Sequence, residues 1–218
     1  MSVAIKTFST RDLWLENRKK YIGGSDVACI MGLNPWKSNI QLWQEKTGRA
    51  ESKDIGDNSL VRYGVNAEPL LRELFKLDYP KMKVEYKENN TWLNSKYPYA
   101  AASLDGWMMD PDNRLGIFEC KTATISSASQ KAKWENNCIP DNYFCQVLFY
   151  MAVCEADFVI LKAQLKYERD GEEPFIVTKH YRIERSEVEA DIKLLMDRTE
   201  RFYRCIQEDK EPALLINF

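Results

Sequence analysis

Apolar and polar residues alternate with a helical period through the first 80 residues of the chain. This spacing predicts four helices, over residues 10–20, 27–33, 39–48 and 59–78. We expect Ser25 or Asp26 to cap the second helix and Ser38 to cap the third, because short polar side chains satisfy free N–H groups at a helix start. Pro69 in the fourth helix either occupies a first turn or kinks the helix. The apolar positions of this fourth helix are Val61, Val65, Leu71, Leu74 and Phe75.

Beyond residue 83 the pattern changes to short extended segments and longer apolar runs. Strands are predicted over residues 84–86, 97–101, 104–109, 116–121, 158–167 and 175–183. The turn sequence Asp-Pro-Asp-Asn at 110–113 joins two of these strands into an expected hairpin. Further helices are predicted over residues 127–137 and 141–154.

A capping box at Ser186–Glu189 predicts the start of the last helix. The apolar positions of this helix fit packing on a sheet, which we favour, or a coiled coil. The order of the elements predicts the α/β class, with a central mixed sheet flanked by helices. We expect a single domain over residues 1–218, with N-terminal helices over 1–80 and the sheet with its helices over 81–218.

Composition narrows the available chemistry. The chain has 218 residues, a net charge of −2, six cysteines and one histidine. No Cys pair has C-x2-C spacing, so we expect buried reduced thiols, and the lone His180 disfavours zinc sites and histidine-based hydrolase triads. No apolar run approaches a membrane helix and no export signal is evident, so we expect a cytoplasmic protein without membrane contact.

The segment from Ala101 to Ala123 combines charged residues with apolar neighbours. Asp105 is expected on one strand of the hairpin, and Glu119 and Lys121 on the other. Because side chains alternate across a strand, Glu119 and Lys121 should share one face. Two carboxylates can hold Mg²⁺ while a lysine orients an attacking water. A salt-bridged surface strand would have the same spacing, but the apolar neighbours favour buried strand ends, where unpaired charge is costly.

Four separated blocks of the sequence are RKKYIGGSD, YGVNAEPLLRELF, SLDG followed by ECK, and NYFCQVLFYMAV. Together they resemble the YqaJ-type viral recombinase family, relatives of phage lambda exonuclease within the PD-(D/E)xK nuclease superfamily. They occur in the family's order between Asn17 and Tyr150. The resemblance implies a restriction-endonuclease-like core and a metal-dependent deoxyribonuclease.

By position, the resemblance implies that Asp105 and Glu119 are metal ligands, with the Cys120 backbone carbonyl as a third. The metal would be Mg²⁺, with Mn²⁺ as an alternative, and Lys121 would position the nucleophilic water. Leu104 stands where the superfamily usually has a proline.

Three further residues are implied to belong to the site. Glu68 would be an additional acidic member, although a carboxylate there could also stabilise a helix start. Gln146 and Tyr143 lie three residues apart and would line the site from one helix face. Their alternative roles are a structural hydrogen bond for Gln146 and core packing for Tyr143.

The resemblance also implies a pocket for the 5′-phosphate, formed by Arg18, Ser25 and Ser103. The glycines at 23–24 allow close backbone approach, and the free N–H groups of the next helix favour an anion. An ordinary helix cap is the alternative. The segment TATISSASQKAK lacks the arginine with which lambda-like relatives grip this phosphate. Either Lys131 or Lys133 substitutes for it or the pocket binds the phosphate more weakly, so this role is not assigned to a residue.

The implied function is 5′-to-3′ digestion of one strand of double-stranded DNA from 5′-phosphorylated ends. The 3′ single-stranded tails would serve a single-strand annealing protein in phage-type recombination in a bacterial host, and a homotrimer is implied. Alternatives are a structure-specific or restriction-like endonuclease and a non-catalytic DNA-binding accessory protein. Trp36, in a turn beside Lys37, suits contact with a base, although core packing is the usual role of a tryptophan.

Overall fold

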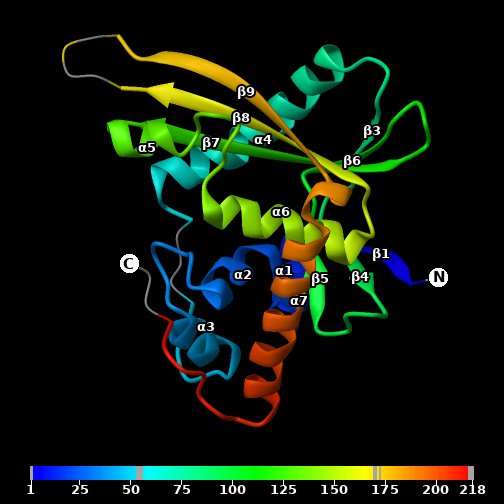
Figure 1. Cartoon of the computed structure of the whole chain (residues 1–218), viewed down its shortest axis with the longest axis vertical. Helices are drawn as coiled ribbons and strands as arrows, with labels where there is room; N and C mark the ends of the chain where they lie inside the picture. The colour runs from blue at the N-terminus through cyan, green and yellow to red at the C-terminus, as the bar shows by residue number, and fades with distance from the viewer. Residues whose placement is uncertain (1, 53–55, 169–170, 172, 216–218) are drawn as a thin grey trace.

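The computed structural model describes residues 2–52, 56–168, 171 and 173–215, which form two mixed β-sheets and seven helices (Figure 1). The four-stranded sheet has the order β1 (Val3–Thr7), β4 (Asn90–Asn94), β5 (Ala100–Ala102) and β2 (Ile22–Gly23). The five-stranded sheet has the order β3 (Lys83–Glu85), β6 (Gly106–Met109), β7 (Leu115–Ile125), β8 (Phe158–Tyr167) and β9 (Phe175–Glu184). Only the pairs β2–β5 and β7–β8 are parallel among these strands. The predicted α/β class is confirmed.

The helices are α1 (Arg11–Lys19), α2 (Gly24–Met31), α3 (Asn39–Lys46), α4 (Ser59–Asp78), α5 (Ala128–Ala132), α6 (Asp141–Cys154) and α7 (Arg185–Gln207). Helix α4 covers one face of the five-stranded sheet, where its Leu71 and Phe75 pack against Phe118 and Ile160. Helix α6 lies against the other face, between the two sheets, with α2 and α7 beyond it (Figure 1). The sequence explains this arrangement, since every residue of the apolar stretch from Val147 to Cys154 in α6 is buried.

Three predictions about helix ends are tested by the backbone. Ser38 caps α3, accepting from the Gln41 N–H at 3.2 Å, as predicted. The predicted cap position of α2 is wrong, because Gly23 occupies the N-cap, although the Asp26 side chain in the first turn does accept from the Gly23 N–H at 2.9 Å. The predicted start of α7 is also wrong: the helix begins one residue before Ser186.

Periodicity overstated the burial of α4. Of its predicted apolar positions, Leu74 is 50% exposed and Val65 is 54% exposed. Pro69 lies in the interior of the helix rather than in its first turn. Helix α5 covers only five of the residues predicted at 127–137, and α7 packs mainly on α6 and α2 rather than on a sheet. A periodic pattern identifies an amphipathic helix without identifying what covers its apolar face.

Candidate active site

The β6–β7 hairpin brings the predicted acidic residues together. The antiparallel register pairs Gly106 with Phe118, so Asp105, the residue before β6, comes alongside Glu119. The sequence predicted Asp105 within the strand, and this is wrong, because Asp105 lies at the entry to β6. Its Oδ2 accepts from the backbone N–H of Cys120 at 2.9 Å and from the Cys120 thiol at 3.3 Å. These two bonds hold the carboxylate against β7.

Glu119 and Lys121 share the face of β7 that meets α6, as strand alternation predicts. The Glu119 side chain is almost completely buried, and its Oε1 accepts from Lys121 Nζ at 2.6 Å and from Gln146 Nε2 at 2.9 Å. Its Oε2 is buried and has no hydrogen-bond partner among the described residues. One oxygen is thus fixed by two donors while the other is left without one.

The electrostatics of this cluster favour an additional positive charge. Burial, followed by the negative charge of Asp105, raises the pKa of Glu119 to about 8. Burial alone would lower the pKa of Lys121, but the charges of Glu119 and Asp105 outweigh burial and raise it, so the ammonium stays charged. Burial and the Asp105 charge also raise the pKa of Glu68, against the opposing effect of Arg72. A cation would relieve the repulsion among the three carboxylates.

Glu68 projects from α4 towards the same cluster and is held there by an arginine. Arg72, one helical turn later, donates from Nη1 to Glu68 Oε1 at 3.0 Å and to the backbone carbonyl of Asp105 at 2.6 Å. The sequence prediction missed Arg72. The feature that could have identified Arg72 is its place between the apolar Leu71 and Phe75, because a charged side chain buried there needs hydrogen-bond partners.

The α6 residues line the cluster from above β7. Gln146 Nε2 donates to both Glu119 Oε1 and the Tyr150 hydroxyl, each at 2.9 Å. The Lys121 ammonium lies 5.1 Å from the centre of the Tyr143 ring. Tyr150, also missed from the sequence, packs so closely on α2 that a Cβ at Gly24 would lie 2.3 Å from its Cε1. Glycine at position 24 is required by this approach.

The residues proposed for phosphate binding lie on connected elements. Parallel pairing of β2 with β5 aligns Gly23 with Ala101, and the two chains run on in the same direction to Ser25 and Ser103. Ser25 is exposed in the first turn of α2, and Ser103 is half-buried. Two hydroxyls therefore follow adjacent strand ends, one of them at a helix N-terminus.

Arg18 lies at the end of α1, with its guanidinium 4.5 Å from the centre of the Trp14 ring. Burial raises the pKa of Tyr150, and the positive charge of Arg18 opposes this rise. Arg18 therefore acts on a residue that borders the acidic cluster. Of the substitutes for the missing arginine, Lys131 pairs with Glu135 at 3.2 Å, and Lys133 is the exposed C-cap of α5.

The described residues fit a hard divalent cation in part. No three His, Cys, Asp or Glu side chains in the described ranges form a ready-made metal cage. Mg²⁺, however, keeps several waters and needs only one or two carboxylates besides its substrate. The buried, unpartnered Oε2 of Glu119 beside the Asp105 charge is a donor set of that kind.

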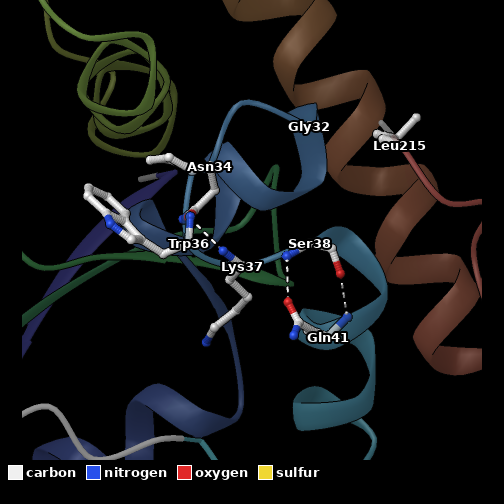
Figure 2. Close-up of a pocket in the computed structure, with 8 residues that line it drawn as sticks. Gly32, Asn34, Trp36, Lys37, Ser38, Gln41 and Leu215 are labelled. Carbon is white, nitrogen blue, oxygen red and sulfur yellow. Dashed lines mark hydrogen bonds between the residues drawn. The ribbon is translucent and has the colours of Figure 1, made fainter. Parts of the chain in front are cut away.

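A separate surface feature lies in the turn between α2 and α3. The Asn34 side chain accepts from the backbone N–H groups of Trp36 and Lys37 at 2.8 and 3.0 Å, which fixes the turn (Figure 2). The Trp36 side chain is 76% exposed, and the hollow beside it also contains Gln41 and Leu215. Trp36 is therefore not a core residue.

The remaining sequence predictions concern cysteines, histidine and membranes. All six cysteines are free thiols, and four of them are buried: Cys29, Cys120, Cys145 and Cys154. His180 lies in β9, as predicted. No helix in the described part of the chain has the length and apolar character needed to cross a membrane.

Comparison with known proteins identifies similar chains. Residues 13–157 match the YqaJ-like viral recombinase domain. The uncharacterized protein YqaJ of Bacillus subtilis (strain 168) is 32% identical over 173 residues, covering 75% of this chain and 51% of that protein. This chain thus spans about half the length of that curated relative. The alkaline exonuclease LHK-Exo from Laribacter hongkongensis superimposes with a TM-score of 0.60 at 16% identity, covering 90% of this chain and 95% of LHK-Exo. Its complex with dAMP superimposes equally well.

Proposed function

Because the chain belongs to the YqaJ-like viral recombinase family, we propose that it is a Mg²⁺-dependent exonuclease that digests one strand of double-stranded DNA from the 5′ end. The observation that supports this most is the buried Oε2 of Glu119, which has no partner among the described residues and belongs to a carboxyl whose pKa is raised by burial and by the Asp105 charge. An unpartnered carboxylate oxygen is costly unless a cation binds it. The alkaline exonuclease fold and the dAMP complex of LHK-Exo agree with a DNA substrate.

In this proposal Asp105, Glu119 and the Cys120 carbonyl would hold Mg²⁺, or Mn²⁺ in its place. The bound metal would stabilise the attacking and leaving oxygens of phosphodiester hydrolysis. Lys121, fixed by its 2.6 Å bond to Glu119, donates to the attacking water and offsets charge at the phosphorus. Gln146 holds the Glu119 carboxylate in one orientation, with Tyr150 as its second acceptor.

Substrate binding would use the elements next to this cluster. Arg18, Ser25, Ser103 and the N-terminus of α2 would bind the 5′-phosphate of the digested strand. Tyr143 and Glu68 would line the path of the scissile bond. The single-stranded 3′ tail would pass to a single-strand annealing protein. A homotrimer enclosing the duplex would compensate for a chain whose net charge of −2 gives weak passive attraction to DNA.

Digestion of defined DNA substrates tests the proposal. The wild-type protein in Mg²⁺ should degrade a 5′-phosphorylated linear duplex, release label from 5′ ends first, and leave a covalently closed circle intact. The Lys121→Ala variant should be nearly inactive on the same linear duplex. Cleavage of the circle would instead identify an endonuclease, and binding without cleavage of either DNA would identify a non-catalytic accessory protein.

A further inference from the structure

Arg72 is a buried arginine whose position on α4 the nuclease proposal leaves unexplained. Only 8% of its side chain is exposed, and its guanidinium makes three kinds of contact. It pairs with the Glu68 carboxylate at 3.0 Å, donates to the backbone carbonyl of Asp105 at 2.6 Å, and lies 3.6 Å from the centre of the Tyr86 ring. A buried charge is stable only when its hydrogen bonds are satisfied, so these contacts are what allow the guanidinium to be buried.

We propose that Arg72 is a positioning residue that fixes Glu68 and Asp105 relative to each other and so shapes the cation site. This inference rests on the proposed nuclease function. A single nitrogen, Nη1, bonds both to the Glu68 side chain and to the Asp105 main chain, 33 residues further along the chain. Helix α4 and the entry to β6 are therefore joined at one atom.

The contacts of Asp105 explain why this joint matters. Asp105 lies just before β6, outside the regular strand pairing with β7. Its carboxylate is held by Cys120, and its backbone carbonyl is held by Arg72. Without the arginine, the main chain at Asp105 would lose this donor, and Glu68 would lose its only ion pair among the described residues. Two acidic side chains would then be free to move apart.

Apolar contacts beside the arginine anchor α4. The neighbouring Leu71 and Phe75 are 1% and 0% exposed and anchor the helix on the five-stranded sheet. A lysine at position 72 would preserve the charge but not the planar group that stacks on Tyr86 while donating to two acceptors. Arg72→Lys therefore removes the positioning contacts while keeping the positive charge and the apolar residues that dock the helix.

Calorimetric titration of Mn²⁺ into the 218-residue chain without DNA tests the inference, alongside Mg²⁺-dependent digestion of a linear duplex. We expect Arg72→Lys and Arg72→Gln to weaken Mn²⁺ binding by about 10–100-fold, as is typical for residues that orient metal ligands. The Mg²⁺ concentration for half-maximal digestion should rise by a similar factor. Arg62→Lys, an exposed arginine on the same helix, is the matched control and should change neither value.

Tyr86→Leu keeps the test decisive if the Arg72 variants unfold, and a double variant adds a test if Arg72→Lys folds. Tyr86→Leu removes only the stacked ring of a residue that is 37% exposed, and it should weaken Mn²⁺ binding while the melting temperature stays near the wild-type value. Glu68→Gln combined with Arg72→Lys should cost less than the two single changes together, since both act on one contact. If folded Arg72→Lys binds Mn²⁺ as tightly as the wild type, the inference about Arg72 is overturned and the nuclease proposal is not. A wild-type protein that neither binds Mn²⁺ nor digests DNA would overturn the nuclease proposal, and this inference with it.

Discussion

The contact between α2 and α6 makes Gly24→Ala the sharpest single test of the site geometry. The new Cβ would lie 2.3 Å from Tyr150 Cε1, 2.7 Å from its Cζ and 3.0 Å from Gln146 Cγ. Carbon atoms at favourable separation are about 3.5–4.0 Å apart, so the ring must move by more than about 1 Å. Tyr150 is only 5% exposed and has little free space.

The magnitude follows from two opposing effects. Overpacking a filled site costs about 1–3 kcal/mol, whereas replacing glycine by alanine in a helix gains at most about 1 kcal/mol. We therefore expect Gly24→Ala to lower the free energy of unfolding by about 1–2 kcal/mol. Because Tyr150 and Gln146 together orient Glu119, the digestion rate should also fall, by about 10–100-fold.

Urea denaturation and initial digestion rates measure both effects, with Gly64→Ala as the matched control. At that position in α4, the new Cβ meets only Thr122 Oγ1, at 3.3 Å, on a half-exposed side chain that can rotate. The control should be as stable as wild type or more stable by up to about 1 kcal/mol. A Gly24→Ala protein with wild-type stability and rate would refute the described packing of Tyr150 against α2.

Three other outcomes follow from the structure. Because Glu119 must lose a proton with a pKa of about 8 to bind a cation, Mn²⁺ affinity measured by calorimetry should rise about tenfold per pH unit from pH 6 towards 8 and then level off. The exposed Cys138 should react quickly with a thiol reagent at pH 7.5, whereas Cys29 and Cys145, whose pKa values burial raises to about 12 and about 11, should react only after unfolding. Trp36→Ala should weaken DNA binding in fluorescence anisotropy by about 1–3 kcal/mol without changing the melting temperature, and Trp36→Phe should retain part of the affinity.

Each of these outcomes has a clear contrary result. Mn²⁺ affinity that is flat across pH 6–8 would show that Glu119 is already ionised or does not bind the metal. Rapid labelling of Cys29 or Cys145 in the folded protein would contradict their burial. Unchanged DNA affinity in Trp36→Ala would remove the exposed turn from the DNA-binding surface.

Strand and helix patterns predicted most of the framework of the site. Alternation along β7 correctly put Glu119 and Lys121 on one face, and the apolar run 141–154 matched α6, with Gln146 directed at Glu119. These predictions worked because they depend on local spacing. Asp105 was predicted within a strand and instead precedes it, since the end of strand pairing depends on the partner strand as well as on the residue itself.

Long-range contacts account for what the sequence did not reveal. Arg72 donates to the Asp105 carbonyl before β6, and Tyr150 packs against Gly24 of α2, and the sequence shows neither of these contacts. Strand β4 was missed because asparagine disfavours strands. The buried Asn90 side chain instead bonds to the backbone of Leu104, at 2.9 Å and 3.0 Å. Such compensation becomes visible only when the two segments are seen side by side.

Substitution of Glu119 by its uncharged isostere tests the central claim most directly, because it removes one carboxylate charge and little volume. The rate of nucleotide release from a 5′-phosphorylated linear duplex in Mg²⁺ should be compared between wild type and Glu119→Gln, with melting curves recorded for both. We expect the wild type to release nucleotides and Glu119→Gln to release none above background while remaining folded. Equal rates from the two proteins would contradict a cation site built on this carboxylate.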